Sequence, residues 1–82
     1  MRFKLTSEAK KYIDSQDKTT VKRIYETLRA ITKEPPEGDI KTLSGQNNVK
    51  RARVGEMRII YEIKGDHAII IKIAPRGQTY KQ

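Results

Sequence analysis

The sequence contains no cysteine, few acidic residues and no long apolar run among its 82 residues. A chain without cysteine cannot form disulfides, cysteine-ligated zinc sites or thiol nucleophiles. The longest apolar run, AIII at 68–71, is far shorter than the roughly 20 residues that cross a membrane. The N-terminus has no apolar signal core, so we expect a cytoplasmic protein with no membrane partner. No carboxylate cluster indicates a metal site, and no cofactor is expected.

Positive charge dominates the chain, with 18 Lys and Arg against 10 Asp and Glu and a formal net charge of +8. The imbalance lies in the second half: residues 41–82 hold nine basic and three acidic residues, whereas residues 1–40 hold nine and seven. Such a bias favours polyanionic partners, meaning nucleic acid, an anionic membrane or an acidic protein. The length suits a single domain, 1–82, with a small core.

The first half of the sequence predicts one short strand and two helices. Charged and apolar residues alternate over 2–5, which suits a strand. Thr6 or Ser7 can cap a first helix, and Asp17 can cap a second that stops before Pro35-Pro36. Apolar residues at helical spacing in the second helix are Val21, Ile24, Tyr25, Leu28 and Ile31. We expect this stripe to face the core.

The second half has a period of two, with three alternating runs at 49–54, 57–63 and 68–74. These runs are separated by turn residues and predict a β-meander. The expected fold class is therefore α+β. A short N-terminal strand and a two-helix hairpin would pack on a mostly antiparallel sheet, in the order β-α-α-β-β-β.

The stretch RARVGEMRIIY, which begins at Arg51, predicts a tight hairpin with Gly55-Glu56 as its two-residue loop. In this register Arg53 is opposite Arg58, and Arg51 is opposite Ile60. Paired residues share a face, so the three arginines point together to one side of the sheet. The opposite side faces the helices and consists of Ala52, Val54, Met57, Ile59 and Tyr61.

The register of the last strand depends on the loop that precedes it. We expect a three-residue loop, Gly65-Asp66-His67, because a two-residue loop would bury Lys72, and an unpaired buried ammonium is costly. With this loop the core side of the strand holds Ile69, Ile71 and Ile73. The arginine side holds Ala68, Ile70, Lys72 and Ala74, and Arg76 continues its parity.

The facing arginines need an explanation, because directly opposed like charges on a sheet cost about 0.2–1 kcal/mol. An anion bound between them would reverse the sign of this energy, and the planar guanidinium group is suited to phosphate. Exposed sheets also carry basic residues that discourage edge pairing, which is an alternative for each arginine alone. Three arginines on one face of one hairpin favour binding of an anion.

The segments LSGQNNVKRARVGEMRIIYEI, from Leu43, and AIIIKIAPRGQTYK, from Ala68, resemble the RelE/ParE superfamily of toxin–antitoxin toxins. In that family a Leu-x-Gly, here Leu43 and Gly45, precedes a basic R-x-R-x-G-x-x-R hairpin, and R-x-x-x-Y ends the chain. The resemblance covers nearly the whole chain. It implies a cytoplasmic toxin that a cognate antitoxin neutralises in a toxin–antitoxin hetero-oligomer. RelE-like members cleave mRNA in the ribosomal A site, and ParE-like members poison DNA gyrase.

By analogy with RelE-like members, the resemblance implies the catalytic residues Arg51, Arg53, Arg58, Arg76 and Tyr80. The lysines expected to contact RNA are Lys50, Lys72 and Lys81. The chain departs from the family in two ways. Arg51 and Arg53 stand where relatives often have lysine, and a guanidinium is never deprotonated to act as a base. Pro75 stands where some relatives have a histidine, and we expect no catalytic role for His67, in a predicted turn.

Two functions remain open. The favoured one is a metal-independent endoribonuclease, in which the RNA 2′-OH attacks the adjacent phosphorus, arginines stabilise the charge and the ribosome supplies the geometry. The alternative is a non-nuclease toxin that inhibits DNA gyrase. A generic RNA-binding module fits less well, because only Tyr80 is expected near the cluster as a stacking residue. The expected partners are a cognate antitoxin, mRNA and the ribosome.

Overall fold

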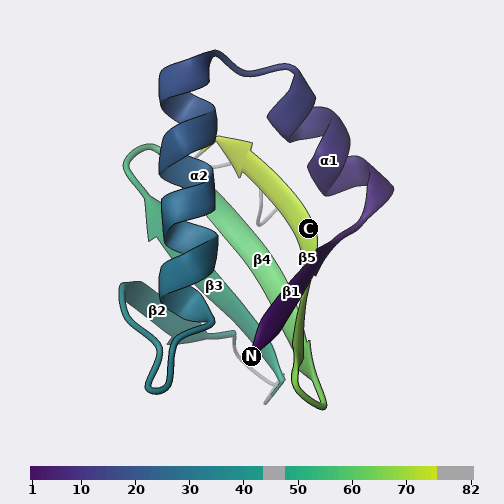
Figure 1. Cartoon of the computed structure of the whole chain (residues 1–82), viewed down its shortest axis with the longest axis vertical. Helices are drawn as coiled ribbons and strands as arrows, with labels where there is room; N and C mark the ends of the chain where they lie inside the picture. Colours follow the sequence, from purple (N-terminus) through teal and green to yellow (C-terminus); the bar gives the residue numbers. More distant parts are fainter. Residues whose placement is uncertain (44–47, 76–82) are drawn as a thin grey trace.

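The computed structural model describes residues 1–43 and 48–75. Its elements are β1 (Arg2–Leu5), α1 (Ser7–Asp14), α2 (Lys18–Ile31), β2 (Asp39–Thr42), β3 (Val49–Val54), β4 (Met57–Lys64) and β5 (His67–Pro75). The strands form a five-stranded sheet in the order β1-β5-β4-β3-β2, in which β1 runs parallel to β5 and the other neighbours are antiparallel. Both helices lie on the same face of this sheet (Figure 1). The predicted α+β class with a mostly antiparallel sheet is confirmed.

Both helices begin at capping residues that the sequence predicts. The Thr6 hydroxyl accepts a hydrogen bond from the amide of Ala9 at 3.2 Å, and an Asp17 carboxylate oxygen accepts one from the amide of Thr20 at 2.9 Å. Each bond satisfies an amide that the first turn of a helix leaves unpaired. Helix α2 ends at Ile31, before the two prolines, as expected.

The core lies between the helices and the sheet. The stripe of α2 contributes Ile24 and Leu28, which have no exposed surface, and Ile31, which is 1% exposed. Tyr61 of β4 is the largest of the fully buried side chains. The other members of the cluster are Ala9, Ile13, Ala52, Val54, Ile59, Ala68, Ile70 and Ile73. Truncation of a buried leucine or isoleucine to alanine costs about 2–5 kcal/mol, so this cluster is critical in a chain of this size.

The predicted hairpin of β3 and β4 is confirmed. Arg53 pairs with Arg58, Arg51 pairs with Ile60, and Gly55 has a φ of 56° in the two-residue loop. Glycine adopts this left-handed conformation without a steric penalty, which is why such loops favour it. The hairpin therefore presents one apolar face to the helices and one basic face away from them.

Strand β2 is an addition to the predicted order of elements. It pairs with β3 at the edge of the sheet, with Asp39 opposite Arg53 and Lys41 opposite Arg51. Its four residues, DIKT, contain one apolar side chain, so the alternation is too short to predict a strand. Only the pairing with β3 makes this segment a strand.

The predicted three-residue loop before β5 is wrong. Lys64 pairs with His67, so the loop is Gly65-Asp66, and Gly65 has a φ of 60°. A glycine with positive φ at the first loop position is typical of two-residue hairpins. The first half of β5 is consequently shifted by one residue from the expected register, and a shift of one turns every side chain to the other face.

A β-bulge reverses this shift halfway along β5. Tyr61 pairs with Ile70 and Ile60 pairs with Lys72, so Ile71 is an extra residue in the ladder. Lys72 therefore lies on the arginine side after all, although the loop has two residues. The argument that a two-residue loop must bury Lys72 is wrong because the bulge restores the alternation. The core face of β5 holds Ala68, Ile70 and Ile73, in place of the expected Ile69, Ile71 and Ile73.

Candidate functional site

The face of the sheet opposite the helices carries a cluster of basic side chains. Cross-strand partners share a face, so the register defines two rows of residues across β2, β3, β4 and β5. The first row is Asp39, Arg53, Arg58 and Ala74. The second row is Lys41, Arg51, Ile60 and Lys72. We call Arg51, Arg53, Arg58 and Lys72 the arginine face, and their predicted placement on one side of the sheet is confirmed.

Arg51 is buried although it carries a charge. Its exposed fraction is 8%, the same as that of its cross-strand partner Ile60. Arginine is rarely buried unless its guanidinium is paired. In the described part of the chain, however, the Arg51 Nε atom has no hydrogen-bond partner. A buried donor left unsatisfied costs roughly 1–3 kcal/mol, which an acceptor such as a phosphate oxygen would recover.

Arg53 and Arg58 form the like-charge pair of the first row. Arg53 is exposed and Arg58 is half-buried. Directly opposed residues on antiparallel strands have Cβ atoms about 4.5–5.5 Å apart. Two guanidinium groups at this spacing can approach one phosphate from two sides, each with paired N–H donors. The pair is therefore suited to an anion that presents several oxygens.

Lys72 joins the arginine face from β5 and also reaches toward α1. Its Nζ atom lies 3.9 Å from a Glu8 carboxylate oxygen, and the two side chains are 39% and 64% exposed. An ion pair this long and this exposed contributes little to stability. Breaking this ion pair so that Lys72 can bind a ligand anion would therefore cost little free energy.

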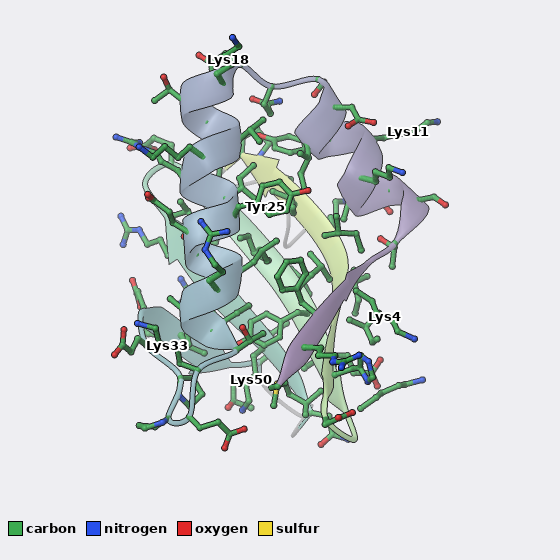
Figure 2. The ribbon with its side chains drawn as sticks, in the orientation of Figure 1. Lys4, Lys11, Lys18, Tyr25, Lys33 and Lys50 are labelled. Carbon is green, nitrogen blue, oxygen red and sulfur yellow. The ribbon has the colours of Figure 1, made fainter. Side chains whose placement is uncertain are left out.

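Lys50, expected to contact RNA, lies on the helix side of the sheet and away from the arginine face. It pairs with Tyr61 across the strands, and its Nζ atom donates to the Thr42 hydroxyl at 3.0 Å. In Figure 2 it lies below the C-terminal end of α2. There it borders a cavity of about 550 Å³ lined also by Met1, Ile31, Pro36, Gly38, Ile40, Thr42, Tyr61 and Ile63. The alternation along β3 separates Lys50 from Arg51 and Arg53.

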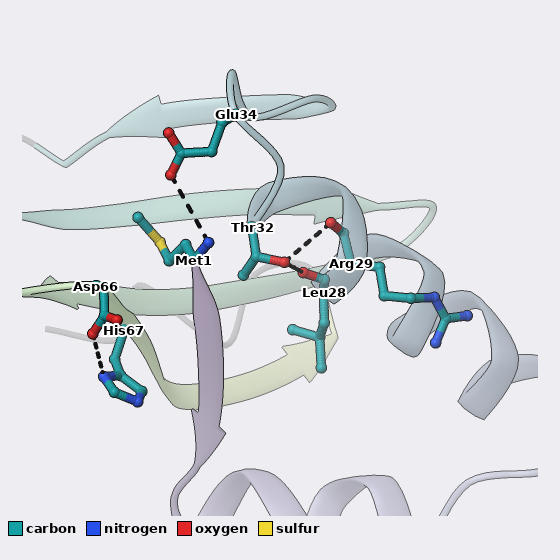
Figure 3. A network of polar contacts seen from close by, with 7 residues as sticks. All are labelled: Met1, Leu28, Arg29, Thr32, Glu34, Asp66 and His67. Carbon is teal, nitrogen blue, oxygen red and sulfur yellow. Dashed lines mark hydrogen bonds and ion pairs between the residues drawn. The ribbon is translucent and has the colours of Figure 1, made fainter.

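His67 and the N-terminus form polar contacts at the other end of β5 (Figure 3). The His67 Nδ1 atom lies 2.9 Å from an Asp66 carboxylate oxygen, within the turn that precedes β5. The amino group of Met1 lies 3.8 Å from a Glu34 carboxylate oxygen. The cross-strand partners of His67 are Arg2 and Lys64, and neither belongs to the arginine face.

Three of the predicted site residues, Arg76, Tyr80 and Lys81, lie outside the described residues, as does Gly45 of the Leu-x-Gly motif. The last residue of β5, Pro75, pairs with Met57, next to the pair of Arg58 and Ala74. The strand that leads to the C-terminal motif therefore ends beside the first row.

Two charged residues of this surface, Asp39 and Lys41, are absent from the predicted site. They enter it because β2 pairs with β3 and turns Asp39 toward Arg53 and Lys41 toward Arg51. The only signal in the sequence is the short alternation DIKT, in which Ile40 points to the core. Without the strand pairing, nothing relates these residues to the hairpin.

No helix among the described residues is long and apolar enough to cross a membrane. Within 1–43 and 48–75, histidine, aspartate and glutamate side chains do not gather in groups of three or more that could hold a metal ion.

Two helices packed on one face of a mostly antiparallel five-stranded sheet, with arginines on the other face, define a small RelE-like toxin fold. Residues 3–80 match the family model described as the ParE toxin of the type II toxin–antitoxin system parDE. The match covers almost the whole chain, and the chain therefore belongs to this toxin family.

Similar proteins agree with this assignment. The RelE1 protein of Methanocaldococcus jannaschii is 39% identical over 62 residues, which are 73% of this chain and 69% of that protein. The archaeal RelE–RelB complex of Pyrococcus horikoshii contains a chain with a TM-score of 0.78 and 28% identity, over 94% of this chain and 96% of that one. The isolated Escherichia coli RelE toxin, at 13% identity, has a TM-score of 0.76 over 95% of this chain and 86% of that one, and so shares the fold.

Proposed function

We propose that this toxin cuts mRNA on the ribosome as a metal-independent endoribonuclease. The observation that carries the proposal is the gathering of Arg51, Arg53 and Arg58 on one sheet face. Arg51 is buried there, with an Nε donor that no described residue satisfies. This arrangement suits a ligand that brings several negative oxygens at once, as an RNA phosphate does.

In the proposed reaction the nucleophile is the 2′-hydroxyl of the RNA itself. Its oxygen attacks the adjacent phosphorus and the P–O5′ bond breaks, which leaves a 2′,3′-cyclic phosphate and a 5′-hydroxyl. Negative charge develops on the non-bridging oxygens, where Arg53 and Arg58 would act as preorganised donors. The loss of one such donor typically costs about 100- to 1,000-fold in rate.

The remaining site residues have two kinds of support, the strand register and the family resemblance. Lys72 lies beside the arginines and would contact the RNA backbone. Arg76, Tyr80 and Lys81 are included by the family resemblance alone: the arginine as a phosphate ligand, the tyrosine as a positioning or acid–base group, and the lysine as an RNA contact. Lys50 is on the other side of the sheet, so a role in binding the scissile phosphate is not proposed for it.

The ribosome would supply the substrate geometry. In-line attack needs the 2′-oxygen, phosphorus and 5′-oxygen aligned, and a flexible RNA rarely holds this arrangement. The arginine face is a charged surface on a sheet, which can bind a phosphate without bending the strand around it. A bound and oriented message in the ribosomal A site provides the missing alignment, and the toxin would accordingly act in the cytoplasm.

We also propose that a cognate antitoxin neutralises this toxin in a hetero-oligomer. The similar RelE chains of Pyrococcus horikoshii and Methanococcus jannaschii were solved in complex with RelB. With a net charge of +8 and a basic sheet face, the chain favours a partner that is locally acidic. Such a partner would compete with RNA for the arginine face.

The proposal is tested by induction of the chain in a bacterial host, with and without the small gene adjacent to its own. The 5′ ends of mRNA are mapped in translated frames, and DNA breaks are measured in the same cultures. We expect in-frame mRNA cuts that disappear with Arg58→Ala and when the adjacent gene is co-expressed. DNA breaks that depend on gyrase, without mRNA cuts, would contradict the nuclease and support the gyrase alternative.

A further inference from the structure

The proposed cleavage needs a group that removes the proton from the 2′-hydroxyl. The arginine face cannot provide one from its own members, because a guanidinium has no acceptor and stays protonated in proteins. Lysine ammonium groups such as those of Lys41 and Lys72 likewise donate hydrogen bonds and accept none. Among the described residues, the remaining candidates for this proton acceptor are the carboxylates on the same face.

Two carboxylates of the described strands lie on this face: Asp39 of β2 and Glu62 of β4. Glu62 has Val49 and Ile69 as its cross-strand partners, so apolar side chains flank it. Asp39 has Arg53 as its partner and stands at the end of the row that contains the arginine pair. Asp39 is thus in line with the groups that would hold the scissile phosphate.

The Asp39 carboxylate is available to a ligand. It lies on the edge strand, is exposed, and forms no ion pair within 1–43 and 48–75. Gly38, with a φ of 121°, turns the chain into β2 just before it. Glu62 is four residues along β4 from Arg58, outside the row, whereas Asp39 is at one end of the row and Ala74, next to Pro75, is at the other.

We propose that Asp39 is a catalytic residue, the general base of the RNA cleavage. This inference rests on the proposed nuclease function. The carboxylate takes the proton of the 2′-hydroxyl while the 2′-oxygen forms its bond to phosphorus. The P–O5′ bond breaks, and the leaving 5′-oxygen takes a proton from water to become the 5′-hydroxyl. Arg53 lies between Asp39 and Arg58 in the row, and its positive charge would offset the repulsion between the carboxylate and the phosphate.

The test compares single-turnover cleavage of mRNA on programmed ribosomes by the wild-type chain, Asp39→Asn and Glu62→Gln. Both substitutions replace a carboxylate on the same sheet face with an amide of similar shape. We expect Asp39→Asn to slow cleavage by about 100-fold or more, the usual contribution of a general base. Glu62→Gln should cleave at the wild-type rate, and all three chains should bind ribosomes equally and unfold at similar temperatures.

A pH series separates base catalysis from a structural role. Without the carboxylate, hydroxide must remove the proton, so the deficit of Asp39→Asn relative to the wild type should shrink as the pH rises. A structural defect would leave the ratio of the two rates unchanged across the same pH range. Asp39→Glu, which keeps a carboxylate on a longer side chain, should recover part of the activity.

The outcomes distinguish this inference from the function on which it rests. If the wild type cuts ribosome-bound mRNA and Asp39→Asn cuts it equally fast, or Glu62→Gln carries the loss, Asp39 is not the base and the nuclease function stands. If the wild type leaves ribosome-bound mRNA intact, the nuclease proposal fails and the assignment of Asp39 fails with it.

Discussion

The hydroxyl group of Thr6 lies 2.9 Å from the carbonyl oxygen of Ile71, the extra residue in the bulge of β5. The same hydroxyl lies 2.9 Å from the carbonyl oxygen of Ile70 and accepts a hydrogen bond from the amide of Ala9. The hydroxyl has a single proton to share between the two carbonyl groups, and the Ile70 carbonyl also accepts from the Thr6 amide, so one side chain caps α1 and provides a donor where the ladder is interrupted. The bulge in turn places Lys72 on the arginine face, so a residue on the helix side supports the site on the other.

Replacement of Thr6 with alanine should destabilise the fold by about 2 kcal/mol. Loss of an N-cap costs about 1 kcal/mol, and a part-buried carbonyl left without its donor adds about 1 kcal/mol or more. Urea denaturation of the wild type, Thr6→Ala and Thr6→Ser measures the difference. The serine variant keeps the hydroxyl and should lose much less. Equal losses in the two variants would assign the effect to the methyl group instead of the hydrogen bonds.

Arg58→Ala should abolish toxicity and leave the protein folded, with an unchanged or slightly higher unfolding temperature. The substitution removes one of two directly opposed positive charges on β3 and β4, a pair that costs about 0.2–1 kcal/mol. Growth arrest after induction and thermal unfolding of the purified chain measure the two effects. Arg29→Ala, on the exposed side of α2, is the control and should remain toxic. A toxic Arg58→Ala at matched expression would remove the arginine face from the active site.

Binding of the antitoxin should weaken as the salt concentration rises. A partner that masks the arginine face must bring acidic groups, and salt screens their attraction to arginines at the surface. Titration calorimetry with the product of the adjacent gene, at several ionic strengths, measures the slope. Arg53→Ala, which removes the exposed arginine of the first row, should reduce both affinity and slope. A tight complex that is insensitive to salt would exclude charge masking as the means of neutralisation.

Free RNA should be cut very slowly, and the same message should be cut rapidly on ribosomes. The reason is that orientation of the reacting atoms contributes a large part of the rate, and the arginine face provides charge without that orientation. Purified toxin is mixed with one mRNA, with and without ribosomes, and EDTA is added to the reaction with free RNA. Tyr80→Phe should slow cleavage on ribosomes if its hydroxyl takes part. Efficient cleavage of free RNA would refute the role of the ribosome.

The N-cap of α2 should make stability depend on pH in the acidic range. Hydrogen bonds from the Thr20 side chain and backbone lower the pKa of Asp17 in the folded chain. A lowered folded-state pKa stabilises the fold above the unfolded pKa, and this stabilisation is lost as the pH falls through the folded value. The difference in unfolding free energy between the wild type and Asp17→Asn should therefore shrink in acid. A constant difference would show that the Asp17 charge contributes nothing to the cap.

Local features of this protein could be predicted from the sequence because they depend on neighbours in the chain. Thr6 and Asp17 cap their helices through the amides of residues three positions later. Gly55-Glu56 closes a hairpin whose register follows from the loop length, and that register sorts Arg51, Arg53 and Arg58 to one face. The common face of these three arginines can therefore be predicted from the alternation of residues along the strands and from the length of the loop.

Tertiary structure decided the features that depend on pairing between distant segments. The Thr6 hydroxyl binds the carbonyl of Ile71 in the bulge, although the two residues are 65 positions apart in the chain. The residues around Ile71 show no pattern that would predict this bulge. Strand β2 exists because it pairs with β3, and this pairing brings Asp39 to Arg53 and completes the first row. Nonlocal contacts of this kind depend on which segments the packed core brings together, and a one-residue change of register exchanges the two faces. The positions of the charged residues, the starts of the helices and the hairpin turn all follow from the order of residues in the chain. Which charged side chains lie next to one another depends on the pairing of the strands in the folded sheet.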